Sequence, residues 1–127
     1  MGATTARYRV EVSHEVEKWL DTDSHPDPRI RAGIYAKFKF KADLLADNGT
    51  LIDGDHIRKV AGYTNLWEIR IKEGTILHRF FFGLGDGGVI GVACVVAKTS
   101  SQLRPAVLKN AERRVADYLT SLERLER

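Results

Sequence analysis

The chain has 127 residues, of which 43% are hydrophobic and 29% charged, a composition that fits a folded domain and excludes a disordered or repetitive chain. Its net charge of +3 permits a nucleic-acid partner without indicating one, because phosphate binding depends on clustered Lys and Arg rather than on total charge. The single cysteine, Cys94, excludes an internal disulfide, and no apolar run approaches the ~18 residues that span a bilayer. We therefore expect one domain over residues 1–127 that stays in the cytoplasm and contacts no membrane.

The first third of the chain predicts a strand and two helices. Residues 8–12 alternate between apolar and charged side chains, which is the period of a half-buried strand. Ser13 can cap a short helix that follows directly. Asp27-Pro28 is a helix start, apolar side chains recur every three or four residues after it, and Asn48-Gly49 marks its end.

The rest of the chain predicts three strands and a last helix. Strands at 66–72 and 76–84 are separated by Glu73-Gly74, and a glycine turn leads to an almost wholly apolar strand at 89–97. An amphipathic helix follows from Pro105. The predicted order is β-α-α-β-β-β-α, an α+β fold with an antiparallel or mixed four-stranded sheet and helices on one face.

The turns predict which side chains share a face of the sheet. A two-residue loop at Glu73-Gly74 gives three cross-strand pairs: Lys72–Thr75, Arg70–Leu77 and Glu68–Arg79. The glycine turn gives three more: Leu84–Val89, Arg79–Cys94 and Thr75–Lys98. Because opposed residues point to the same side, one open face is basic: Arg70, Lys72, Arg79 and Lys98, with Glu68 among them.

The opposite face is predicted to be the core against the helices. It carries large apolar side chains: Trp67, Ile69, Ile71, Ile76, Phe80 and Phe82. Small residues are expected beside these rings: Gly91, Ala93 and Ala97. On the basic face two ordinary interpretations stay open, since Arg79 could simply pair with Glu68 and Lys98 could mark a solvated strand end.

Several of these segments occur together in a known family. They are Leu66-Trp67-Glu68-Ile69-Arg70-Ile71, His78-Arg79-Phe80-Phe81-Phe82, a glycine turn, Lys98-Thr99 and Ala111-Glu112-Arg113-Arg114-Val115-Ala116-Asp117-Tyr118. Their order resembles the phage-derived, HigB-like branch of the RelE toxin superfamily, over roughly residues 59–118. The resemblance implies a ribosome-dependent mRNA endonuclease that uses no metal or cofactor. It also implies a cognate antitoxin, often a helix-turn-helix protein, with which the toxin forms a hetero-oligomer.

Site residues follow from the resemblance by position. Three match the family's basic catalytic positions: Arg70, Arg79 and Lys98. Three more would steer mRNA or ribosomal RNA, although they are equally explained as surface charge: Arg58, Lys59 and Lys72. His56 is the candidate general base, because His78 is predicted to be a hydrogen-bonded imidazole on the core face.

The chain departs from the family pattern after the last strand. The expected F-x-K-K-T reads Val95-Val96-Ala97-Lys98-Thr99, without the phenylalanine and the first lysine, and no tyrosine follows closely. These departures favour an alternative, a non-cleaving module that binds RNA or the ribosome. The run 83–88 fits G-x-G-x-x-G, but a strand rather than a helix follows it, so a hairpin turn is expected. The four histidines lack the spacing of metal ligands.

Overall fold

The computed structural model describes residues 7–51, 57–99 and 102–125. In chain order these form β1 (Arg9–Val12), α1 (His14–Lys18), the π-helix η1 (Trp19–Asp23), α2 (Pro28–Asn48), the 3₁₀ turn η2 (Gly49–Leu51), β2 (Ile57–Lys59), β3 (Trp67–Glu73), β4 (Ile76–Leu84), the 3₁₀ turn η3 (Asp86–Gly88), β5 (Val89–Lys98) and α3 (Pro105–Leu125). The sheet order is β1-β5-β4-β3-β2. Strand β1 runs parallel to β5, and the other neighbours are antiparallel. The α+β class is therefore confirmed, with a mixed sheet.

The predicted sheet of four strands is wrong, because the described residues form five. The additional strand, β2, pairs with β3 through only three residues. Three residues are too few to show the alternation of apolar and polar side chains on which a strand prediction rests. The strand and helix order therefore gains one β element before β3.

Local capping signals explain where α1 and α2 begin. The Ser13 Oγ accepts a hydrogen bond from the Val16 backbone N–H at 3.3 Å, and the Asp27 carboxylate accepts one from the Arg29 N–H at 2.9 Å. Pro28 occupies the first turn of α2, and the helix ends at Asn48 as predicted. None of the helices in the described ranges is long and apolar enough to cross a membrane.

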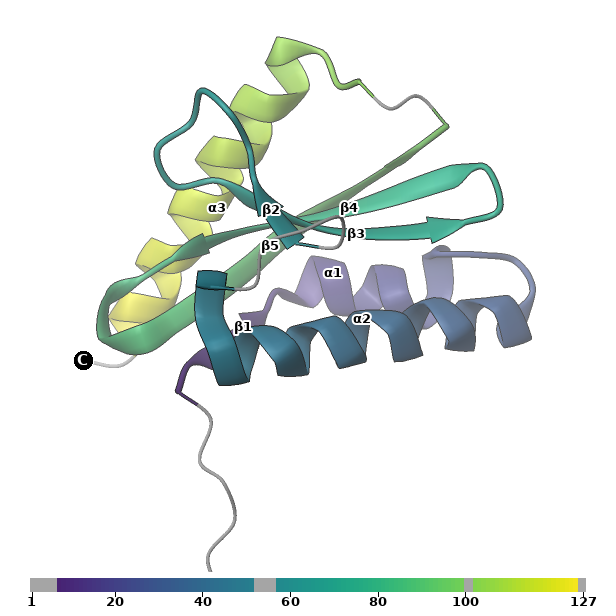
Figure 1. The fold of residues 1–127 in the computed structure, drawn as a ribbon, viewed down its shortest axis with the longest axis horizontal. Coiled ribbons are helices and arrows are strands. Elements are labelled where there is room, and N and C mark those ends of the chain that lie inside the picture. Colours follow the sequence, from purple (N-terminus) through teal and green to yellow (C-terminus); the bar gives the residue numbers. More distant parts are fainter. Residues whose placement is uncertain (1–6, 52–56, 100–101, 126–127) are drawn as a thin grey trace, which may run out of the picture.

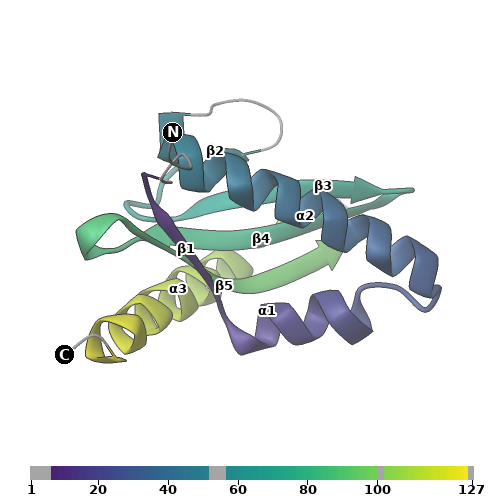
Figure 2. The same cartoon turned by 90° about the horizontal axis from the view of Figure 1, so that it is seen from below.

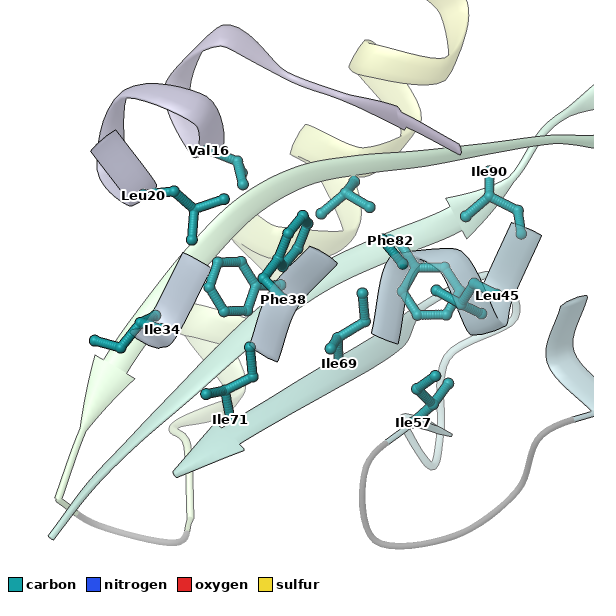
Figure 3. Close-up of a cluster of buried hydrophobic side chains, with 13 residues drawn as sticks. Val16, Leu20, Ile34, Phe38, Leu45, Ile57, Ile69, Ile71, Phe82 and Ile90 are labelled. Atoms are coloured by element: carbon teal, nitrogen blue, oxygen red, sulfur yellow. The ribbon is translucent and has the colours of Figure 1, made fainter. Parts of the chain in front are cut away.

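Helices α1 and α2 cover one face of the sheet (Figure 2). The predicted stripe of α2 is buried there through Ile34, Phe38, Ala42 and Leu45. Figure 3 shows Ile34, Phe38 and Leu45 of this stripe with the strand residues that they cover: Ile69, Phe82 and Ile90. The rings of Phe38 and Phe80 lie 4.7 Å apart, centroid to centroid. This half of the core is the one that the sequence predicts, with one exception on β4: Ile76, expected among the core residues, is 37% exposed.

The prediction that all helices lie on one face is wrong, because α3 packs on the other side of the sheet (Figure 1). It buries Ala111 and Val115 against Phe81, Cys94 and their neighbours in a second apolar cluster. The backbone of β5 admits the helix closely at Gly91, where an added Cβ would lie 2.8 Å from Leu119 Cδ2. Helix α3 therefore covers part of the face that carries the basic residues, and only the rest of that face is open.

Both predicted turns are shifted in register. The first loop is Gly74-Thr75, with Gly74 at φ +60°, so that Glu73 pairs with Ile76 and Arg70 with Arg79. Glycine suits this place because the first loop residue needs a positive φ. The shift moves each partner by two residues, and the period of a strand is two. The predicted faces of β3 and β4 are therefore retained although the predicted pairs are wrong.

In the second hairpin the register changes at a β-bulge. Leu84 pairs with Ile90 rather than with Val89, Arg79 with Val96 rather than with Cys94, and Lys98 with Leu77 rather than with Thr75. The irregularity falls opposite Phe81 and Phe82, where β5 has one extra residue, Ala93. Gly91 and Ala93 consequently face α3, and their predicted place beside the rings of the α1–α2 core is wrong.

Candidate anion-binding site

Three neighbouring strands place charged side chains at one spot on the sheet. Arg58 of β2 lies directly opposite Glu68 of β3, and Arg70 of β3 lies directly opposite Arg79 of β4. Glu68 and Arg70 are two residues apart on one strand and therefore point to the same side. The register alone thus brings three arginines and one carboxylate together. We call these four residues the arginine cluster.

The side chains of the arginine cluster meet at Glu68. Its Oε1 lies 3.2 Å from Arg58 Nε, which donates a hydrogen bond, and 3.4 Å from Arg70 Nε. Its Oε2 lies 3.6 Å from Arg79 Nε. The open interpretation that Arg79 pairs with Glu68 is therefore correct, but the pair is one of three that share the carboxylate.

The cluster grades from buried to exposed. The Arg79 side chain is 3% exposed, that of Arg70 20% and that of Arg58 51%. Glu68 and Arg79 form the inner wall of a cavity of about 320 Å³, which lies within the range of small-ligand sites. Its remaining lining is mostly apolar: Val60, Ala61, Leu103 and Leu108, with Arg58 and Lys59. The predicted open basic face is thus a partly enclosed pocket.

Electrostatics favour an anion in this pocket. Burial lowers the pKa of Arg79, the Glu68 carboxylate opposes this shift, and the nearby charges of Arg70 and Arg58 add to it. A guanidinium nevertheless stays charged in proteins. The Arg70 Nε, at 3.4 Å, makes an ion pair but no hydrogen bond, and this buried N–H has no acceptor in the part of the chain that the structure describes. Three guanidinium groups against one carboxylate leave positive charge in excess, which an oxyanion in the pocket would balance.

The other predicted site residues lie around this pocket rather than in it. Lys98 points to the same side of the sheet as Arg79 but ends β5, exposed and opposite Leu77, a diagonal step from the cluster. The position of Lys98 therefore agrees with the alternative interpretation, in which it marks a solvated strand end. Lys72 is exposed farther along β3, and Lys59 lines the cavity. His56 lies outside the described residues.

Sequence reasoning missed two parts of the site. It treated Arg58 only as a steering charge, whereas the structure places it in the cluster. The signal was available in principle, since a turn between 60 and 66 pairs Arg58 with Glu68. The apolar wall from Leu103 and Leu108 could not be found this way, because it depends on which face α3 covers.

Two buried side chains that could carry chemistry, His78 and Cys94, are not part of the arginine cluster. His78 lies on the core face as predicted, although the described residues offer its Nδ1 no hydrogen-bond partner. Cys94 is buried, and burial raises the pKa of its thiol to about 12, so it packs as a small apolar side chain. Within the described ranges no three His, Cys, Asp or Glu side chains form a group that could hold a metal ion.

The fold is α+β, and the arginine cluster beside the cavity is a candidate site for an anion. Residues 28–116 match the family described as phage-derived protein Gp49-like, and the chain belongs to this family. The family is part of the RelE/Gp49 toxin superfamily, is associated with the toxins of toxin–antitoxin systems, and typically comprises ribonucleases. Comparison with individual curated proteins gives no match.

Proposed function

We propose that the protein is the toxin of a type II toxin–antitoxin pair, of the HigB-like kind, and cleaves mRNA on the ribosome. The observation that carries this proposal is the convergence of Arg58, Arg70 and Arg79 on one carboxylate beside a cavity. Planar guanidinium groups bind two phosphate oxygens at once and stay charged. Because the family typically comprises toxin ribonucleases, we propose RNA as the substrate and an antitoxin as the protein partner.

The protein need not provide a nucleophile for this reaction, because RNA carries its own. The 2′-OH loses a proton and attacks the adjacent phosphorus, the P–O5′ bond breaks, and the 5′ oxygen takes up a proton. Charge grows on the phosphate oxygens in between, where fixed cations in a partly buried pocket act most strongly. Arg70 and Arg79 would bind these oxygens, Arg58 and Lys59 would hold the flanking backbone, and Lys72 would steer the strand. Lys98 would add charge from the neighbouring strand.

A second candidate function is a module that binds RNA or the ribosome without cutting. It is favoured by the contacts of Glu68, the one carboxylate among the described residues that line the pocket. Arginines contact both of its oxygens. A general base needs a free lone pair within reach of the proton. The remaining candidate base is His56, and the family's first lysine is Ala97 here.

The experiment is expression in a growing bacterial culture, followed by primer extension on a translated message. We expect growth arrest and cuts in phase with codons. Arg79→Ala should lower the cleavage rate by about 10²- to 10³-fold, the loss typical for one transition-state donor. Arrest without cuts would establish the binding module, and the absence of arrest in the wild type would contradict both functions.

Controls separate chemistry from folding. Arg79 is buried, so its loss could unfold the chain, and circular dichroism of the purified variant must match the wild type. Arg58→Ala, at a half-exposed position, should also weaken cleavage without that risk. Arg29→Ala removes an arginine whose side chain is 95% exposed on α2 and should change nothing.

A further inference from the structure

The arginine cluster contains a repulsion that the fold must overcome. Arg70 and Arg79 are directly opposed on β3 and β4, and like charges at such positions destabilise a sheet. Arg58 brings a third positive charge from β2 to the same carboxylate. Three guanidinium groups so close together would spread apart unless a negative charge held them.

Glu68 supplies that negative charge from a buried position. Its side chain is 5% exposed, and all three arginines approach it through Nε. A guanidinium has five N–H donors, and the contact with Glu68 involves only the Nε of Arg58 and of Arg70, whose side chains are 51% and 20% exposed. One carboxylate against three guanidinium groups leaves positive charge in excess, which is what an anion site needs.

We propose that Glu68 is the positioning residue of this site: it fixes the three arginines in a geometry that fits the reacting phosphate and limits how strongly the site binds RNA. Two opposite effects follow from removing its charge. The cluster gains one net positive charge and binds the RNA backbone more tightly. The released guanidinium groups lose their alignment, and a misplacement of about 1 Å costs on the order of 10²-fold in rate.

The test is Glu68→Gln, which keeps the shape of the side chain and removes its charge. Affinity is measured by fluorescence anisotropy with a 2′-O-methyl RNA oligonucleotide, which cannot be cleaved. The rate is measured as single-turnover cleavage of a message in a translating extract. We expect the dissociation constant to fall about fivefold and the rate constant to fall about 10²-fold. A side chain that only stabilised the fold would weaken binding and cleavage together.

A matched control and a second variant keep the outcomes apart. Glu73→Gln makes the same change on the same strand, at a carboxylate that lies 3.5 Å from Lys37, and should leave both quantities within about twofold of the wild type. If Glu68→Gln does not fold, Glu68→Asp keeps the charge and shortens its reach. It should leave affinity unchanged and still lower the rate. Equal losses of affinity and rate in the variant that folds, or no change in either, would overturn the role of Glu68.

The rate half of this inference rests on the proposed ribonuclease function, whereas the affinity half does not. If the wild type binds the oligonucleotide but cleaves no message, and Glu68→Gln still tightens binding, the proposed cleavage fails and the role of Glu68 stands. If the wild type cleaves and Glu68→Gln binds RNA no more tightly, cleavage stands and the positioning role fails.

Discussion

His78 stands next to Arg79 on β4 but points to the opposite side of the sheet. It is buried against Trp19 of η1, with the two ring centroids 6.1 Å apart. Burial lowers the pKa of His78; Glu73 opposes this shift, and the charges of His25 and Lys37 add to it. The buried site therefore favours the neutral imidazole, which belongs to the core under η1 and not to the arginine cluster.

This environment predicts a loss of stability in mild acid. The unfolded chain takes up a proton on His78 near its ordinary pKa of about 6.5, whereas the folded chain does so only at lower pH. Stability is therefore unaffected above about pH 7.5, falls as the pH drops below the ordinary value, and levels off below the lowered one. Urea unfolding of the wild type and His78→Leu at pH 7.5 and 5.5 measures this effect.

The comparison cancels the other titrating groups, which both proteins share. We expect the wild type to lose more stability than His78→Leu between the two pH values. Equal losses would show that the imidazole is protonated as easily in the folded chain as in the unfolded one.

At the scale of elements, the approach of α3 to the sheet depends on missing side chains. Beside the close contact with Leu119, an added Cβ at Gly91 would lie 3.2 Å from Tyr118 Cδ2. An added Cβ at Gly83 would lie 2.5 Å from Val115 Cγ1. The helix thus lies where two paired glycines of β4 and β5 leave room for it.

Gly91→Ala should therefore destabilise the protein by about 1–3 kcal/mol, the usual cost of overpacking. The contacts are ends of side chains that can shift, which favours the lower part of that range. Chemical denaturation gives the free energy of unfolding. Gly33→Ala is the control: it lies inside α2 with nothing within 4 Å of the added Cβ, and should stabilise by about 0.5–1 kcal/mol. A Gly91→Ala variant as stable as the wild type would refute the close packing.

The elements also show which parts of the fold a sequence can predict. Helix α2 is predicted almost to the residue, because its cap at Asp27, its apolar stripe and its end at Asn48 are local signals. The face that α3 covers has no local signal of this kind. The bulge at Ala93 has none either, and it turns Gly91 toward α3. The three successive buried residues Phe80, Phe81 and Phe82 are a sequence signal for this arrangement, since a run of large apolar side chains indicates a strand covered on both faces.

The candidate site was half predictable for the same reason. Arg70 and Arg79 share a face whether the turn is placed at 73–74 or at 74–75, because the two registers differ by an even number of residues. The addition of Arg58 needed the short strand β2, and the enclosure of Arg79 needed the position of α3. A strand pattern therefore predicts the side on which a residue lies, but not its exposure.

For the whole molecule, the net charge of +3 is small compared with the local concentration of positive charge at the arginine cluster. Elsewhere many cations have acidic neighbours, such as Lys39 with Asp43 on α2 at 3.2 Å. At the cluster, three cations share one carboxylate. A nucleic-acid chain would therefore be drawn to this pocket rather than to the surface as a whole.

The salt dependence of RNA binding tests this local origin. Each phosphate neutralised on a single strand contributes about 0.7 to the slope of log K against log salt. Arg58→Ala should lower the slope by about that amount. Arg29→Ala removes the same charge but should not change the slope, because Arg29 belongs to α2, which covers the other face of the sheet (Figure 2). Both variants are measured by fluorescence anisotropy with an uncleavable RNA oligonucleotide. The salt concentration is varied between about 50 and 200 mM, a range over which such slopes are large enough to measure. Equal slopes for the two would mean that RNA senses the total charge, and the pocket would then not be where the strand binds.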